Sequence, residues 1–363
     1  MPIFNPVEKN LAVSLYGINV IPNSRINIQF SVDNLENIIE ISNANIDGRL
    51  TDLNENSSEE LDLTGIGRKR YVAMLSESTA SVSIFPKQRY ASFFLSTCGS
   101  PNPVLSLDPL ISLFLPMKAE VRIFTSSSIS SVLGALSADE EEFWSRFDEQ
   151  RVPYFYTMKS AEKDKNGIYF NLFSELHELK PIPLLDDKSS PVEKIMIVSM
   201  YDSDMAEIRE LSEKCSLPEL EGIIEETGNK VIGRMSKIFK PFENSDIDGF
   251  SYVGMMDKGQ AAYHVTPEHA YSSFYISGYS DTNPYRALKP LLSLFSPQKA
   301  EVRIIGSSPL DKIDQISYRD SANFWEEFQK EEIPSSFQIN NPEKTTKELY
   351  FELGQRIKST TQT

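Results

Sequence analysis

The sequence contains two copies of one unit, which constrains the fold more than any other feature. Residues Pro109–Ile123 read PLISLFLPMKAEVRI and residues Pro290–Ile304 read PLLSLFSPQKAEVRI, so twelve of fifteen positions are identical at an offset of 181. Near the start of each copy the offset is 185, where VEKNLAVSLYG begins at Val7 and VEKIMIVSMYD begins at Val192. Agreement at a fixed spacing over such lengths indicates an internal duplication rather than chance.

Each copy is predicted to be an α+β unit. Strands are indicated where apolar residues and β-formers alternate or run together, and helices where an apolar periodic stretch follows a capping pattern. The predicted strands of the first copy are Val13–Tyr16, Ser81–Ile84, Arg89–Leu95 and Glu120–Phe124. Leu107–Leu115 and the segment after Ser137 are predicted helices, and Asn43–Glu60 and Ser160–Gly167 are predicted surface loops.

The two copies are expected to pack against each other through their sheets. Helices on one face of a sheet leave its other face apolar, and two such faces can bury each other. We therefore expect a four-layer αββα sandwich, with two mainly antiparallel sheets face to face and the helices outside. The chain would form a single domain made of two repeats, residues 1–180 and 190–363, with residues 180–188 as the connector.

Composition narrows the function classes. The 363 residues include 36 Lys and Arg against 52 Asp and Glu, and the net charge of −16 disfavours phosphate backbones and anionic lipid surfaces. We expect no nucleic-acid or membrane partner. The first residues, MPIFNPVEKN, lack a signal-peptide pattern, which predicts a cytoplasmic protein. The two cysteines, Cys98 and Cys215, provide neither a disulfide framework nor a metal-ligand cluster, so no metal is expected.

Reactive residues that occur in only one copy are the candidates for chemistry, because shared positions mostly reflect shared architecture. Cys98 is aligned with Tyr279, Ser251 with Arg70, and His264 with Ser83. One copy also has the segment LSEST, residues 75–79, where the other copy has MDKGQ. If the copies pack face to face with pseudo-twofold symmetry, the serine and cysteine of one copy can meet the serine and histidine of the other at one edge.

The residues alone leave the function open. A single His in a strand is more often structural than catalytic, a buried Cys commonly packs as a small hydrophobe, and serine-rich runs are usually turns. A serine hydrolase or a cysteine–histidine protease is conceivable from composition, but no G-x-S-x-G motif occurs, and nothing in the sequence aligns a Cys–His pair. Glycine-rich phosphate loops and H-E-x-x-H zinc patterns are absent from the sequence as well.

Four short motifs follow one another along the chain: Leu75-Ser76-Glu77-Ser78, Thr97-Cys98-Gly99, Gly249-Phe250-Ser251 and His264-Val265-Thr266-Pro267-Glu268. Phe4 followed by Val7-Glu8-Lys9 precedes them. In this order they resemble the signatures of the eukaryotic-type S-adenosylmethionine decarboxylases, a pyruvoyl-dependent family. The resemblance spans nearly the whole chain, and the fold of that family is itself an internally duplicated αββα sandwich.

The resemblance implies a lyase that processes itself. Ser78 would attack the carbonyl of Glu77, and the chain would split there into a β chain, 1–77, and an α chain, 78–363. Ser251 would hydrogen-bond and protonate the cyclic intermediate, and His264 would remove the α-proton of residue 78. The α chain would then begin with a pyruvoyl group made from Ser78, which is the implied cofactor.

The same resemblance implies the substrate and its contacts. The pyruvoyl carbonyl would form a Schiff base with S-adenosylmethionine, and Cys98 would return a proton to the α-carbon after CO₂ departs. Glu8 would support both processing and the charge of the substrate. The implied substrate-binding residues are Phe4, which stacks on adenine, Glu268, which accepts hydrogen bonds from the ribose, and Leu75, Ser76 and Glu77. The product would be the aminopropyl donor for spermidine and spermine synthesis.

The chain departs from the family pattern at several positions. Asn5 replaces a second acidic residue near Phe4, and Ile195 and Tyr275 stand where animal members place the carboxylates that bind putrescine. We therefore expect little or no activation by putrescine. Besides the two chains of one precursor, a homodimer is left open. Two alternative functions also stay open: a pyruvoyl decarboxylase of ornithine or arginine, and a non-catalytic paralogue that regulates an active partner.

Overall fold

The computed structural model describes fourteen stretches of the chain, and it divides the chain into two compact units, Met1–Pro191 and Val192–Thr363. The described residues are 8–19, 30–52, 69–76, 78–86, 88–125, 140–163, 167–175, 193–203, 217–239, 249–266, 270–279, 282–307, 321–345 and 347–356. The predicted connector, residues 180–188, lies outside them.

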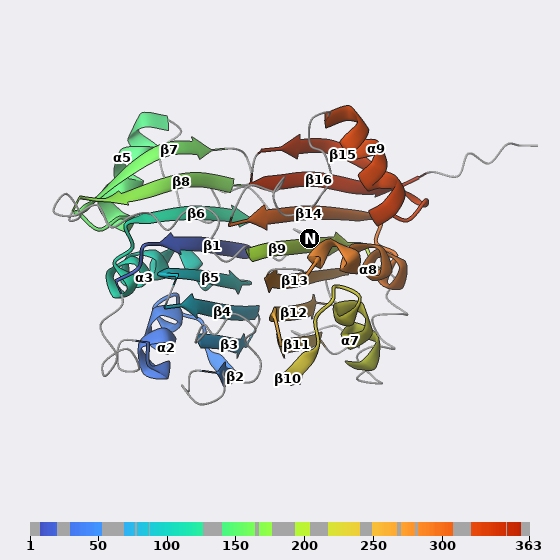
Figure 1. The fold of residues 1–363 in the computed structure, drawn as a ribbon, viewed down its shortest axis with the longest axis horizontal. Helices are drawn as coiled ribbons and strands as arrows, with labels where there is room; N and C mark the ends of the chain where they lie inside the picture. The colour runs from blue at the N-terminus through green and yellow to red at the C-terminus, as the bar shows by residue number, and fades with distance from the viewer. Residues whose placement is uncertain are drawn as a thin grey trace, which may run out of the picture. The chain divides into compact units, whose positions relative to one another are not determined.

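The first unit is built on one eight-stranded sheet with the order β2-β3-β4-β5-β1-β6-β8-β7, in which every neighbouring pair is antiparallel (Figure 1). Its strands are β1 Lys9–Tyr16, β2 Ile46–Asp52, β3 Lys69–Leu75, β4 Ser78–Phe85, β5 Tyr90–Thr97, β6 Lys118–Thr125, β7 Tyr156–Lys163 and β8 Gly167–Ser174. Its helices are α2 Val32–Glu40, α3 Leu107–Phe114 and α5 Glu140–Arg151, with a short 3₁₀ helix, η2 Pro103–Ser106.

The second unit repeats this plan, with the order β10-β11-β12-β13-β9-β14-β16-β15. Its strands are β9 Glu193–Tyr201, β10 Val231–Phe239, β11 Gly249–Met256, β12 Gly259–Thr266, β13 Tyr271–Tyr279, β14 Lys299–Gly306, β15 Phe337–Lys344 and β16 Glu348–Gln355. Its helices are α7 Leu217–Glu225, α8 Leu288–Phe295 and α9 Ser321–Glu332, with the 3₁₀ helix η5 Pro284–Ala287. The predicted duplication and the two antiparallel sheets are therefore confirmed.

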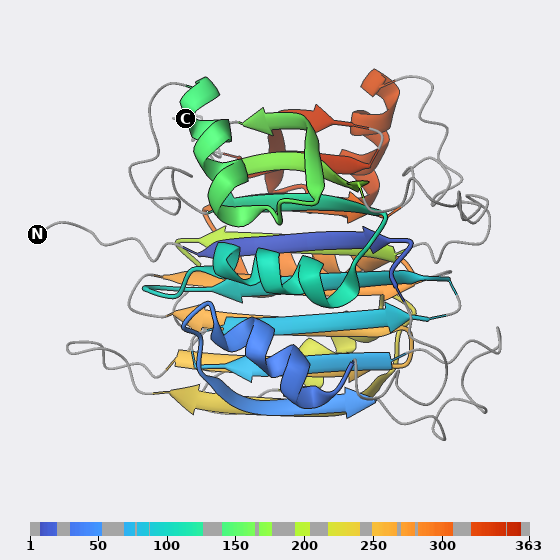
Figure 2. The same ribbon diagram turned by 90° about the vertical axis from the view of Figure 1, so that its left-hand side faces the viewer.

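In each unit, helices pack on one face of the sheet and form the apolar core there. In the first unit, Leu35 of α2, Leu110 of α3 and Phe147 of α5 share one buried cluster with alternate residues of the strands, such as Leu11 and Val13 of β1. Figure 2 shows these helices, blue, teal and green, lying across the sheet of the first unit. The second unit forms an equivalent cluster with α7, α8 and α9. That the two sheets face each other stays a prediction.

Two predicted loops are wrong in part, because polar edge strands resemble loops in sequence. Ile46–Asp52, within the predicted loop 43–60, forms β2, and residues 160–163 form the end of β7. Both strands lie at sheet edges, where one face meets solvent and polar residues are tolerated. Exposure alternates along β2, and the strand pairs with β3 through a register shift next to Gly48.

The helix-free face of each sheet is not the apolar surface that we expected. In the first unit this face carries Ser83, Ser92, Glu120 and Arg122, all at most 5% exposed, beside apolar residues such as Phe94. These residues alternate in sequence with the core residues, so they point to the other side of the sheet. Buried polar groups require hydrogen-bonding partners, and the helix-free face is therefore the place to look for chemistry.

The helices in the described part of the chain are short. The longest, α5 and α9, have twelve residues each. None of the described helices combines the length and the hydropathy needed to span a bilayer.

Candidate functional site

Ser78 lies at a tight turn between two buried strands. It is the first residue of β4 and pairs with Leu75, the last residue of β3, so that only Ser76 and Glu77 connect them. The backbone N–H of Ser76 donates to the carbonyl of Asn45 at 3.0 Å, which anchors the turn. Two polar residues between the strand sequences YVAML and STASVSIF are typical of a hairpin connection. Ser78 itself is buried.

Glu8 and Cys98 lie at the same end of the sheet as Ser78. Lys9 pairs with Thr97 and Thr79 pairs with Ser96, which places Glu8 before β1, Ser78 at the start of β4 and Cys98 directly after β5 at neighbouring strand ends. The Glu8 carboxylate is buried and accepts a hydrogen bond from Ser96 Oγ at 2.8 Å. The structure therefore brings three of the predicted site residues to one end of the first sheet.

Ser251 and His264 form a hydrogen-bonded pair in the second sheet. They face each other on the antiparallel strands β11 and β12, with 2.7 Å between Ser251 Oγ and His264 Nδ1. Both side chains are buried, and burial lowers the pKa of His264 to about 4 because the charged imidazolium loses its hydration. The imidazole is therefore neutral near neutral pH and can accept a proton.

Three predicted site residues, Phe4, Glu77 and Glu268, lie outside the described residues. Leu75 and Ser76 lie at the end of β3 and in the turn that follows. Within the described ranges, no group of three His, Cys, Asp or Glu side chains could hold a metal ion.

At two positions the second copy carries structural groups where the first copy carries reactive ones. Tyr279, the counterpart of Cys98, donates a hydrogen bond to Glu193, the counterpart of Glu8, at 3.2 Å. Gly259, the counterpart of Ser78, has no room for a side chain, since a Cβ atom there would lie 2.0 Å from the carbonyl oxygen of Ser277. A serine at this position would require the backbone to move, so the second copy cannot form the same turn serine.

The first copy has replaced the Ser251–His264 pair in a similar way. Arg70, the counterpart of Ser251, is buried and forms an ion pair with Asp52 at 2.7 Å, and its cross-strand neighbour is Ser83. Each copy therefore carries one half of the predicted set of reactive residues. At the positions of the missing half, each copy has a structural pair instead: Arg70 with Asp52 in the first copy, and Tyr279 with Glu193 in the second.

A row of polar residues crosses the whole second sheet and includes the Ser251–His264 pair. This row is not predicted in the sequence analysis. Each member lies directly opposite the next on the neighbouring strand. The row, in strand order from β10 to β15, is Lys237, Ser251, His264, Ser273, Ser199, Glu301, Glu352 and Asn340. The first sheet has the equivalent row of Asp52, Arg70, Ser83, Ser92, Ser14, Glu120, Asn171 and Lys159. The signal in the sequence is a polar residue in each strand, at matching positions in both copies.

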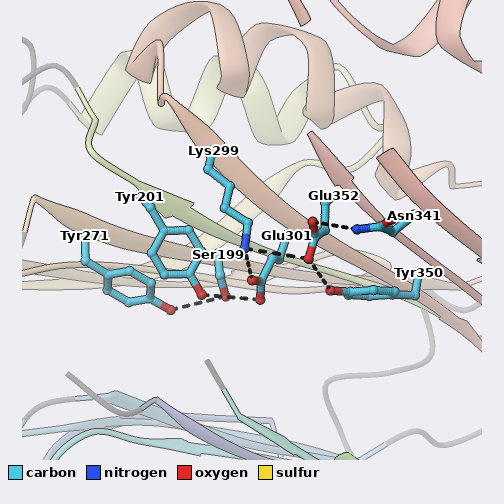
Figure 3. Close-up of polar contacts among 8 residues, drawn as sticks. All are labelled: Ser199, Tyr201, Tyr271, Lys299, Glu301, Asn341, Tyr350 and Glu352. Atoms are coloured by element: carbon cyan, nitrogen blue, oxygen red, sulfur yellow. Dashed lines mark hydrogen bonds and ion pairs between the residues drawn. The ribbon is translucent and has the colours of Figure 1, made fainter. Parts of the chain in front are cut away.

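Charged and phenolic groups gather around Ser199, Glu301 and Glu352 of the second row (Figure 3). Glu301 accepts hydrogen bonds from Lys299 at 2.7 Å and from the Tyr201 hydroxyl at 3.3 Å, and the Tyr271 hydroxyl donates to Ser199 at 3.2 Å. Glu352 lies 3.6 Å from the Lys299 ammonium. Burial acts to lower the pKa of Lys299, but the bond to Glu301 and the two carboxylate charges outweigh it, so that this pKa is raised.

We expect the loss of stability on removing the row's carboxylate to be larger for Glu120 in the first copy than for its counterpart Glu301. Glu120 is 2% exposed and pairs with Lys118 at 2.7 Å, whereas its counterpart Glu301 is 15% exposed and Lys299 keeps a second carboxylate, Glu352. Glu120→Gln should lower the free energy of unfolding by about 2 kcal/mol, because the ion pair of a buried carboxylate with Lys118 is lost, while the Lys118 side chain is 31% exposed and its ammonium regains part of its hydration. Glu301→Gln should lower it by about 1 kcal/mol. Urea denaturation of both variants tests this order, and a larger loss in Glu301→Gln would contradict it.

Comparisons with known proteins find similarity to solved structures. No family model matches the sequence, and no curated protein matches it. Among solved structures, the chain is similar to the Trypanosoma brucei AdoMetDC-delta26 monomer, with a TM-score of 0.32 and 14% sequence identity over 65% of this chain and 84% of that chain.

Proposed function

We propose that the chain is a self-processing, pyruvoyl-dependent decarboxylase whose substrate is S-adenosylmethionine. The observation that carries the proposal is the buried Ser251–His264 pair, with its 2.7 Å hydrogen bond and its neutral imidazole, in a chain that also places Ser78 in a tight turn. Processing needs this combination: a serine beside the peptide bond to be broken, a hydroxyl donor and a neutral base.

The surroundings of Ser78 fit a residue that becomes a pyruvoyl group. Ser78 is the first residue of a fully buried strand. The peptide bond to be broken lies directly before it, where cleavage does not remove any pair of the β3–β4 ladder. The proposed fragment 1–77 would include β1, which lies between β5 and β6 of the other fragment. The two chains should therefore stay together after cleavage without a covalent link.

The chain's own residues account for the processing steps of the proposal. Ser78 Oγ attacks the carbonyl carbon of Glu77, the amide nitrogen leaves with a proton, and the peptide bond becomes an ester. Ser251 donates a hydrogen bond to the cyclic intermediate. His264 then removes the α-proton of residue 78, and the electron pair expels the Glu77 carboxylate by β-elimination. Water converts the remaining dehydroalanine into the pyruvoyl group and releases ammonia.

In decarboxylation, a pyruvoyl carbonyl supplies the electron sink that amino-acid side chains lack. Cys98 would donate a proton to the α-carbon of the substrate, and Glu8, buried and bonded to Ser96, would offer a negative charge to the cationic substrate. Leu75, Ser76 and Glu77 would line the substrate site. Phe4 would stack on the adenine and Glu268 would bind the ribose.

Release of CO₂ from substrate radiolabelled at the carboxyl carbon tests the proposal. The purified protein should release label from S-adenosylmethionine and not from ornithine or arginine. Release from ornithine or arginine alone would keep the processing chemistry and replace the substrate. A protein that stays one chain and releases no label would instead fit a non-catalytic regulator, whose assay is activation of a catalytic partner.

We predict that putrescine leaves this rate nearly unchanged. The two positions that match the family's diamine-binding carboxylates are Ile195, a buried apolar residue of β9, and Tyr275, whose hydroxyl accepts a hydrogen bond from Gln260 at 3.4 Å. Neither side chain offers a charge to an ammonium group. The same label-release assay with and without millimolar putrescine tests this, and a several-fold increase would show that a diamine site exists elsewhere.

A further inference from the structure

The Lys9 side chain holds the segment that follows Cys98. Its ammonium donates to the carbonyl of Gly99 at 2.7 Å and to the carbonyl of Pro101 at 2.9 Å. Lys9 is 8% exposed and pairs with Thr97, the last residue of β5, so the ammonium lies where the chain leaves the sheet. Gly99 has a φ of 70°, which turns the chain sharply directly after the cysteine.

The second copy keeps one of these two contacts, without the thiol. Lys194, the counterpart of Lys9, donates to the carbonyl of Thr282, the counterpart of Pro101, at 2.9 Å. Tyr279 stands there in place of Cys98. This contact is therefore shared architecture, and the chain provides a natural control: a lysine with the same backbone contact and no cysteine beside it.

Lys9 interacts electrostatically with Cys98. On β1, β4, β5 and β6 and the residues that flank them at this end, the charged groups among the described residues are Lys9 and Glu8, and Glu8 is bonded to Ser96. Burial lowers the pKa of Lys9, and the charge of Cys98 acts in the opposite direction. An ammonium group near a thiol favours its thiolate form through Coulomb attraction.

We propose that Lys9 is a positioning residue for Cys98: its ammonium fixes the segment that follows the thiol through the Gly99 and Pro101 carbonyls and places a positive charge near the thiol. This inference rests on the proposed function, in which Cys98 is the proton donor. A proton donor is most effective when its acidity is close to the working pH, which an unassisted buried thiol does not reach.

Ultraviolet absorbance of the thiolate, followed over a pH titration, tests the proposal without any substrate. The spectrum of a Cys98→Ser variant is subtracted to remove tyrosine and Cys215. Lys9→Met should raise the apparent pKa of Cys98 by about one unit. Lys9→Gln, which keeps an N–H donor for the carbonyls, should raise it similarly, and Lys9→Arg should restore it. The matched variant Lys194→Met should leave the thiol titration unchanged while lowering the melting temperature about as much as Lys9→Met.

The outcomes separate this proposal from the proposed function. A thiol titration that is the same in Lys9→Met, Lys9→Gln and the wild type would overturn the role of Lys9, whether or not the protein decarboxylates its substrate. A shift of equal size in Lys194→Met would also overturn it, because the effect would then come from general loosening. Absence of chain cleavage in the wild type would refute the proposed function and leave the thiol measurement interpretable.

Discussion

A Ser78→Ala variant should purify as one chain of 41.1 kDa, while the wild type separates under denaturing conditions into fragments 1–77 and 78–363. Alanine has no hydroxyl to attack the carbonyl of Glu77, so the peptide bond in the β3–β4 turn stays intact. Intact-mass spectrometry distinguishes the two results. The larger wild-type fragment should also lack a normal N-terminal serine, and the variant should release no CO₂ above background.

Ser81→Ala is the matched control. It removes a buried hydroxyl from the same strand, three residues further on, without touching the turn. This variant should still be cleaved. Cleavage in Ser78→Ala, or decarboxylation by the uncleaved Ser78→Ala protein, would end the pyruvoyl proposal.

A His264→Gln variant should be processed at least about 100-fold more slowly than the wild type, because glutamine cannot accept the α-proton. The pH dependence of the processing rate is a sharper test of the role of His264. With a pKa of about 4, the imidazole stays neutral down to that pH, so wild-type processing should be level from about pH 8 to pH 6 and fall only as the pH approaches 4. Timed mass spectra of freshly refolded precursor give these rates. A rate that already falls through about pH 6.5 would mean that the base has an ordinary pKa.

The His264 imidazole also predicts how the stability of the fold depends on pH. His264 has a pKa of about 4 when folded and about 6.5 when unfolded, so between these values the unfolded chain binds the extra proton. Its contribution is therefore fully present above about pH 6.5 and is lost as the pH falls towards 4. When the pH is lowered from about 7 to 4.5, the free energy of unfolding of the wild type should fall by about 2 kcal/mol more than that of His264→Gln. Urea denaturation at both values tests this, and equal losses would contradict a buried neutral imidazole.

Much of the architecture can be predicted from the chain because its signals are local. The repeat of PLISLFLPMKAEVRI and the β-forming runs indicate two similar α+β units, and both sheets bear this out. The cross-strand partner of Ser251 can also be predicted, from the position of a turn. Once Asp257 and Lys258 are recognised as a two-residue connection between Met256 and Gly259, antiparallel counting places Ser251 opposite His264.

The remaining features depend on contacts between residues far apart in sequence. The polar row joins eight strands that are not consecutive along the chain, and its members become neighbours only when β13 and β14 both pair with β9. The lowered pKa of His264 follows from burial by the whole surrounding structure, and the contacts of Lys9 link residues 90 and 92 positions apart. The sequence of β2 predicts a loop because the stability of this strand comes from pairing with β3 rather than from its own polar residues. Local pattern thus decides which segments become strands and helices, whereas charge state and side-chain partnership arise from tertiary packing, because they depend on solvent exclusion and long-range strand order.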